Sequence, residues 1–178
     1  MVPSGKYSFG PNNGRLCVKI EREGMAKKMG HDLRLEVADW SADVTVDADN
    51  PANSSMTVKA STRSLQVVEW FGGVKPMTDG DKKDIKKNID EKCIKDGNVS
   101  FRSTSVNPRG NGALVSGDLT INGSTQPAQF DIQVDSGLVK SVATIAQSHF
   151  GIKPFSAFMG ALKVKDAVDI EFEAKLPS

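Results

Sequence analysis

Histidines and cysteines are the residues of this chain that could carry nucleophilic or metal chemistry, and there are two of each: His31, His149, Cys17 and Cys93. A nucleophilic enzyme needs a serine or cysteine next to a base, and a third group that orients the base. Ser148 precedes His149 only in sequence, and no nucleophile elbow is present. Two imidazoles without a third nearby ligand are also a weak metal signal. We therefore predict no catalytic residue, no metal site, no cofactor and no enzymatic activity.

The two thiols differ in their surroundings. Cys17 shares the polar face of a strand with Arg15 and Lys19, whereas Cys93 lies on the apolar side of a predicted helix. Two cysteines are too few for a disulfide framework, so both are expected to be free. Alternation leaves two interpretations of Cys17 open, a reactive thiol and one that a neighbouring side chain covers.

Basic residues cluster after the first strand and could bind the head group of a ligand. Lys28, His31 and Arg34, together with His149, are the candidates, because charge-assisted hydrogen bonds suit a pyrophosphate. A solvated basic loop is the competing interpretation. The lysines of the predicted helix alternate with aspartates and have no aromatic partners, which argues against nucleic-acid binding.

Composition points to a globular chain. Hydrophobic residues form 38% of the 178 residues and charged ones 25%, and the formal net charge is only +1. A single domain over residues 1–178 is therefore expected, with no overall attraction to a polyanion. The first residues form no apolar leader. The sequence as written predicts a cytoplasmic protein, or a periplasmic or secreted one if a leader has been removed.

Alternation of apolar and polar residues predicts the strands that must position these groups. It is clearest over residues 15–21, 33–37, 40–48 and 56–61, and it resumes over 113–121, 128–134 and 164–174. Turn residues such as Asn122-Gly123 separate the strands. Ile85, Ile89 and Cys93 recur every four residues, which predicts a helix over residues 78–93 that begins at Thr78 or Asp79.

The fold class follows from the shortage of helix. One short helix cannot cover the apolar faces of about eight strands, and closure of the sheet buries all of them together. We therefore predict an all-β fold with one short helix, an eight-stranded antiparallel β-barrel with a central apolar cavity. A sandwich fits the same pattern. A barrel of this size either fills with side chains or holds one small ligand.

Five short segments stand out in order along the chain: residues 7–9 (YSF, expected before the first strand), 30–33 (GHDL), 99–103 (VSFRS), 117–127 (GDLTINGSTQP) and 148–152 (SHFGI). The segment that ends at Pro127 is the most specific, because it joins a strand end, an Asn-Gly turn and a proline. In this order the segments resemble the YceI-like family of polyisoprenoid-binding, lipocalin-like proteins. The resemblance implies an eight-stranded barrel with a lengthened cavity that binds an isoprenoid chain, and it carries over no active site.

We predict that the inward residues bind an elongated apolar lipid, a polyisoprenoid or an isoprenoid quinone. The alternative is a barrel filled with side chains that acts as a stress-associated interaction or scaffold protein. The predicted cavity residues are Val18, Ile20, Leu35, Trp40, Val44, Val58, Phe101, Leu119, Phe130, Ile132, Val142, Ile170 and Phe172.

Two apolar loops are predicted to form the mouth of the cavity. Aromatic and methionine side chains flanked by glycine suit a flexible entrance, and they would equally suit a homodimer face or a transient contact with a membrane. The mouth candidates are Trp70, Phe71, Met77, Phe155, Phe158 and Met159.

Overall fold

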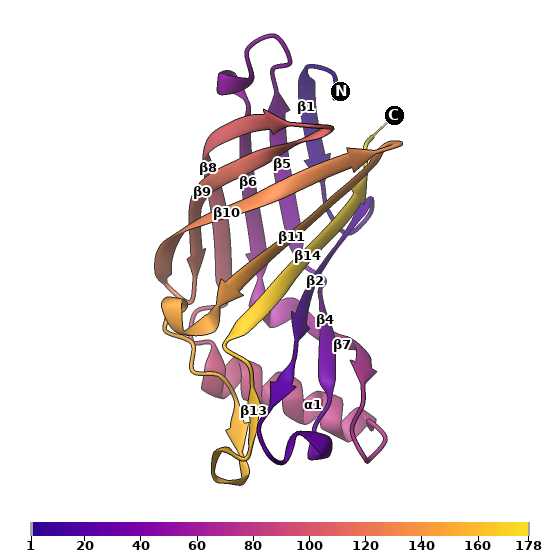
Figure 1. Ribbon diagram of the computed structural model, residues 1–178, viewed down its shortest axis with the longest axis vertical. Coiled ribbons are helices and arrows are strands. Elements are labelled where there is room, and N and C mark those ends of the chain that lie inside the picture. The colour runs from indigo at the N-terminus through magenta and orange to yellow at the C-terminus, as the bar shows by residue number, and fades with distance from the viewer. Residues whose placement is uncertain (1, 178) are drawn as a thin grey trace.

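The computed structural model describes residues 2–177, and eleven of its strands form one strongly curled antiparallel sheet (Figure 1). Their order in the sheet is β1-β5-β6-β8-β9-β10-β11-β14-β2-β4-β7. The strands are β1 (Gly5–Phe9), β2 (Gly14–Ile20), β4 (Asp32–Val37), β5 (Trp40–Val46), β6 (Ser55–Ser61), β7 (Leu65–Phe71), β8 (Asn98–Arg109), β9 (Gly112–Ile121), β10 (Ser124–Asp135), β11 (Leu138–Ala146) and β14 (Ala167–Lys175).

Eight strands were too few, because three long strand segments are interrupted. Residues 10–13 separate β1 from β2, residues 38–39 separate β4 from β5, and the 3-10 turn Thr62–Ser64 separates β6 from β7. The two halves of each segment take separate places in the strand order. The ladder of hydrogen bonds therefore has β1 and β7 as its ends, and β1, which contains residues 7–9, is itself a strand.

A second, small sheet lies at the lower end of the molecule as drawn in Figure 1, where β13 is labelled. It joins β3 (Arg22–Glu23), β13 (Leu162–Val164) and β12 (Ser156–Ala157), with Val164 opposite Arg22. Both chain termini lie at the opposite end of the long axis.

The predicted helix is present and begins where the sequence indicated. Helix α1 (Asp79–Asn88) is capped by Thr78, whose hydroxyl accepts a hydrogen bond from the Asp81 N–H while the Asp81 carboxylate accepts one from the Thr78 N–H. This reciprocal pair satisfies two donors that a helix start leaves free. A wider π-helical turn, Ile89–Cys93, continues the helix to the predicted end.

Helix α1 lies across the lower part of the curled sheet (Figure 1). The side chains of Ile85 and Ile89 pack against the buried cluster that contains Leu35 and Trp40. The helix therefore covers the concave side of the sheet at one end, and the space between helix and sheet becomes the interior of the protein. No helix within residues 2–177 is both long and apolar enough to cross a bilayer.

Candidate ligand cavity

Two adjoining cavities occupy this interior. The larger, of about 230 Å³, lies between α1 and the lower strands, and the smaller, of about 130 Å³, lies higher in the curled sheet. Leu16, Ala60, Val99 and Ile170 line both. Because the two cavities share these walls, they adjoin each other, and we call their boundary beside Ala60 the junction.

The larger cavity has few polar groups in its wall. Ser61, Thr62, Asn88 and Gln147 are the lining residues with hydroxyl or amide side chains. No lysine, arginine, histidine, aspartate or glutamate lines either cavity within residues 2–177. The space therefore suits an uncharged and mainly hydrocarbon occupant.

Aromatic side chains form a large part of the wall of the smaller cavity. The Phe172 ring meets Phe9 and Trp40 edge-on, with ring centroids 5.9 and 5.6 Å apart. Phe101 and Phe130 form a further pair at 5.2 Å. The edge-to-face packing of Phe172 against Phe9 and Trp40 fixes the positions of these rings. The smaller cavity therefore has a largely aromatic wall.

The structure brings most of the predicted cavity residues to these walls. Val44 is half-buried and packs on both core clusters, but it lines neither cavity. The larger cavity is lined by Val18, Ile20, Leu35 and Ile170, and the smaller by Trp40, Val58, Phe101, Leu119, Phe130, Ile132, Ile170 and Phe172.

The prediction that Val142 lines the cavity is wrong. Val142 is 58% exposed on the outer side of β11. Its neighbour Ala143 lines the smaller cavity, and Ile145 lines the larger one. Successive side chains of a strand point to opposite faces. The inward positions of β11 are therefore the odd-numbered ones, and Val142 faces outward.

The prediction that Arg34 binds a ligand head group is also wrong. Arg34 lies on the outer face of the sheet, away from the cavities. Leu33 and Leu35, its neighbours in β4, both line the larger cavity. The Arg34 guanidinium instead forms ion pairs with Glu69 at 2.6 Å and with Glu171 at 3.1 Å. These carboxylates already neutralise it, so Arg34 is not a head-group candidate.

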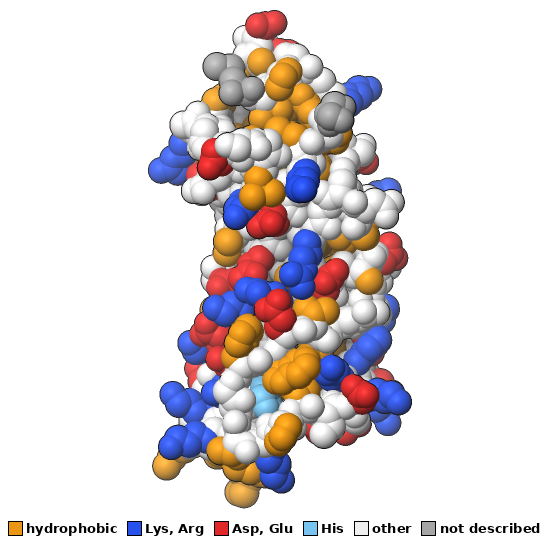
Figure 2. All heavy atoms as spheres, turned by 90° about the vertical axis from the view of Figure 1, so that its right-hand side faces the viewer, with side chains coloured by type: hydrophobic (Ala, Val, Ile, Leu, Met, Phe, Trp, Pro, Cys, Tyr) orange, Lys and Arg blue, Asp and Glu red, His pale blue; other side chains and the backbone are white. Residues whose placement is uncertain are grey.

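The same ion-pair network covers Cys17. Arg15 pairs with Glu36 at 3.2 Å, and Glu36 and Glu171 lie opposite Cys17 on the two flanking strands. Figure 2 shows charged side chains of both signs gathered across the middle of one face of the molecule. Only 3% of Cys17 is exposed, and burial raises the pKa of its thiol. A neutral, covered thiol is a poor nucleophile.

The remaining head-group candidates also lie outside the cavity walls. The His31 Nε2 atom is 2.8 Å from the carbonyl oxygen of Lys75, so His31 holds a loop. Lys28 is exposed in the short helix Lys27–Met29, and His149 is exposed in the turn Gln147–Phe150. No three His, Cys, Asp or Glu side chains of the described chain are grouped to hold a metal ion.

The mouth candidates separate into three kinds. Phe155 lines the larger cavity while 38% of it remains exposed. Met77 is half-buried against the core, and Trp70 is covered on one face by a charge. The Lys82 ammonium lies 4.4 Å above the Trp70 ring, which is otherwise exposed. The others, Phe71, Phe158 and Met159, are exposed and line neither cavity.

The helix wall is the part of the site that sequence reasoning missed. Ile85, Ile89, Cys93 and Ile94 line the larger cavity. Burial raises the pKa of the Cys93 thiol, as expected for a cysteine beside apolar groups. The spacing of four predicted the apolar stripe but gave no sign that it faces a cavity. No sequence pattern marked the polar lining residues, Ser61, Thr62, Asn88 and Gln147, as part of the cavity wall.

Comparisons with known proteins agree with this architecture. A crystal structure of Burkholderia cenocepacia BcnA is similar at a TM-score of 0.66 and 17% identity, over 93% of this chain and 96% of that one. A Campylobacter jejuni YCEI protein is similar at a TM-score of 0.51 and 14% identity, over 80% and 84% of the two chains. No curated protein sequence matches the chain significantly. The YceI-like domain matches residues 18–176. The chain therefore belongs to the YceI-like family, which confirms the resemblance.

Proposed function

We propose that this protein binds an elongated apolar lipid, a polyisoprenoid or an isoprenoid quinone, without chemically changing it. The observation that carries the proposal is the pair of adjoining apolar cavities with shared walls at Leu16, Ala60, Val99 and Ile170. A linear hydrocarbon chain that passes these shared walls would extend into both cavities. The YceI-like family, with its polyisoprenoid-binding members, supports the same class of ligand.

The cavity walls favour hydrocarbon over water. Each water needs two to four polar partners, and most of this surface offers none. A lipid tail that buries several hundred Å² gains on the order of 10 kcal/mol at about 25 cal/mol per Å², before ordering costs. Burial of a chain therefore supplies the affinity.

The uncharged walls also restrict the polar end of the ligand. A buried phosphate would need cationic partners, and none of the lining residues is charged. The amide of Asn88 and the hydroxyl of Ser61 can instead meet a neutral oxygen. A hydroxyl or quinone carbonyl therefore fits inside, whereas a charged group would remain in solvent.

The kinked strand pairs would close the wall around such a ligand. Counted as single bent segments, β1 with β2, β4 with β5, and β6 with β7 reduce the sheet to eight segments. The last segment, β14, pairs with the first through β2. An eight-segment barrel of this kind would enclose the ligand. A filled scaffold would need side chains meeting along the whole axis, whereas the two cavities leave part of the interior empty.

Native mass spectrometry with organic extraction of freshly purified protein tests the proposal. We expect a mass above that of the polypeptide, an isoprenoid in the extract, and uptake of added polyprenol by the extracted protein. A bare polypeptide mass together with no uptake of polyprenol would refute the proposal.

A further inference from the structure

Three loops meet at the lower end of the molecule and form one surface, which we call the basic tip. The Ala26 N–H donates to the Ala161 carbonyl at 2.8 Å, and the Val74 N–H donates to the Lys28 carbonyl at 3.0 Å. These bonds join all three loops into one unit. The basic tip comprises residues 24–30, 72–77 and 155–163.

Large apolar side chains protrude from the basic tip into solvent. Met25 and Met159 are essentially fully exposed, at 99% and 107% of their reference surface, and Phe158 is 62% exposed. Met29 and Val74 add further exposed apolar surface. Figure 2 shows hydrophobic side chains at the lower extremity with basic side chains on both sides. Apolar patches of this kind mark surfaces that bind a partner.

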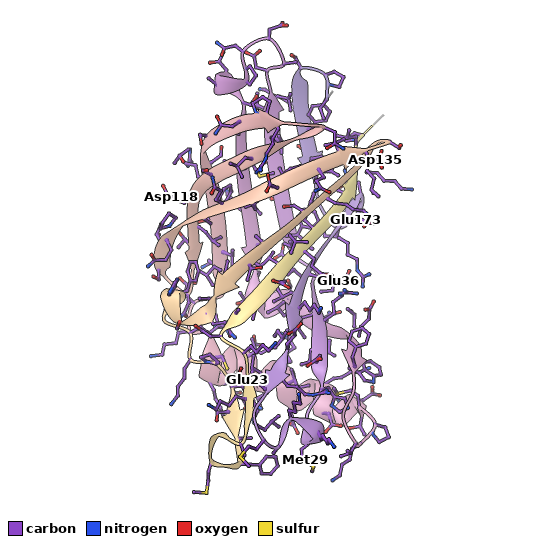
Figure 3. All side chains as sticks on the ribbon, in the orientation of Figure 1. Glu23, Met29, Glu36, Asp118, Asp135 and Glu173 are labelled. Atoms are coloured by element: carbon purple, nitrogen blue, oxygen red, sulfur yellow. The ribbon has the colours of Figure 1, made fainter. Side chains whose placement is uncertain are left out.

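The charge of the basic tip has one sign. Lys27, Lys28, Lys75 and Lys163 are all exposed, and the three loops contain no aspartate or glutamate. The whole chain, by contrast, is almost neutral at +1. Acidic residues resume on the body side of the tip, where Figure 3 labels Glu23 above Met29. Positive charge is therefore concentrated where the methionines and phenylalanine protrude.

The backbone holds two of the apolar side chains in an uncommon conformation. Phe158 and Met159 have φ values of 51° and 56°, in the left-handed region that bulky residues rarely adopt. Both side chains remain exposed, so no buried packing within residues 2–177 accounts for their size. Their apolar character is therefore available to a partner.

We propose that the basic tip docks on the surface of an anionic lipid bilayer. Lysines beside exposed aromatic and aliphatic side chains fit such a surface, because the ammonium groups meet lipid phosphates while the apolar groups enter the interface. A second copy of this chain would bring the lysines of two tips together, and that like-charge contact opposes self-association through the tip.

The docked tip would place the cavity entrance at the membrane. Phe155 belongs to the basic tip and lines the larger cavity, and Val164, next to Lys163, lines it too. An isoprenoid chain could then pass between bilayer and cavity without crossing water. This step rests on the proposed function, whereas docking itself does not.

Vesicle flotation of the full chain tests the docking. Vesicles of pure phosphatidylcholine are compared with an equal mixture of phosphatidylcholine and phosphatidylglycerol. We expect binding only to the anionic vesicles, and weaker binding as salt rises. The Lys27→Glu/Lys75→Glu variant should bind on the order of 25-fold less or weaker still, from about fivefold per lysine.

Two further variants separate charge from apolar contact. Phe158→Asn/Met159→Asn keeps the charge and suits the left-handed backbone, so it should fold and still lose binding by on the order of tenfold. Lys6→Glu/Lys175→Glu makes the same charge change as the lysine variant at the opposite end of the molecule, and it should bind like the unaltered protein.

The outcomes also separate docking from ligand binding. Uptake of polyprenol from detergent micelles should survive Lys27→Glu/Lys75→Glu. Equal binding to both vesicle types, or an equal loss on altering Lys6 and Lys175, would overturn the docking proposal and leave the cavity proposal standing. Vesicle binding without any polyprenol uptake would support docking and overturn the cavity proposal.

Discussion

Ala60 lies at the junction of the two cavities, so a larger side chain there should divide the ligand space. Ala60 lines both cavities and is paired with Trp40 on β5 and Val99 on β8. In Ala60→Phe, the ring would extend into the cavity space that Ala60 lines. We therefore expect the variant to fold with little change in Tm, because the substitution fills a void and does not overpack a filled core.

The expected loss of affinity depends on the length of the ligand. If the junction is blocked, a chain that spans both cavities must withdraw at least one five-carbon isoprene unit. At about 0.8 kcal/mol per buried CH₂, this withdrawal costs about 4 kcal/mol, on the order of a thousandfold in Kd. A short prenol that occupies only the larger cavity should bind almost unchanged.

Prenols of increasing length, titrated by native mass spectrometry or by displacement of a fluorescent apolar probe, measure this difference. Ala52→Phe makes the same substitution at an exposed site and should affect no ligand. The reasoning would be refuted if Ala60→Phe bound long and short prenols as the unaltered protein does. An equal loss for both lengths with an unchanged Tm would also refute the two-cavity description.

Three further predictions concern individual side chains. Hydrogen bonds from Thr78 lower the pKa of Asp81, so the charged form of Asp81 stabilises the fold. Asp81→Asn should therefore reduce Tm above pH 3.8, the ordinary pKa of an aspartate. The difference in Tm should vanish as the pH falls through the lower pKa that Asp81 has in the folded protein. An equal deficit at every pH would contradict this reasoning. Cys93 lines the larger cavity, so polyprenol at ten times its Kd should slow labelling by an apolar thiol reagent about tenfold in a Cys17→Ser background. Unchanged labelling would place the ligand elsewhere. Arg34→Ala should cost about 1 kcal/mol in urea unfolding and speed labelling of Cys17, because it removes two ion pairs from the cover of that thiol. If labelling of Cys17 stays slow, other side chains provide its cover.

Local patterns were sufficient for many elements of this protein. Alternation over residues 40–48 predicted β5. The spacing of Ile85, Ile89 and Cys93 predicted a helix over residues 78–93, and of the two possible caps, Thr78 and Asp79, the structure has Thr78. These features depend on neighbours within a few residues, because backbone geometry repeats every two residues in a strand and about every four in a helix. The family resemblance could also be recognised from the sequence, because it rests on short contiguous motifs.

The tertiary structure decided what lies in the interior and what covers the outside. Cys17 is covered by groups from strands that are far apart in sequence, and no local pattern could bring Arg34 of β4 and Glu171 of β14 together. Small residues on both faces of β11 left no clear alternation to show which positions point inward, so Val142 was assigned to the wrong face. The helical stripe faces a cavity because α1 packs across the concave side of the sheet. An empty space has no residues of its own, so it exists only once walls from distant segments are assembled around it.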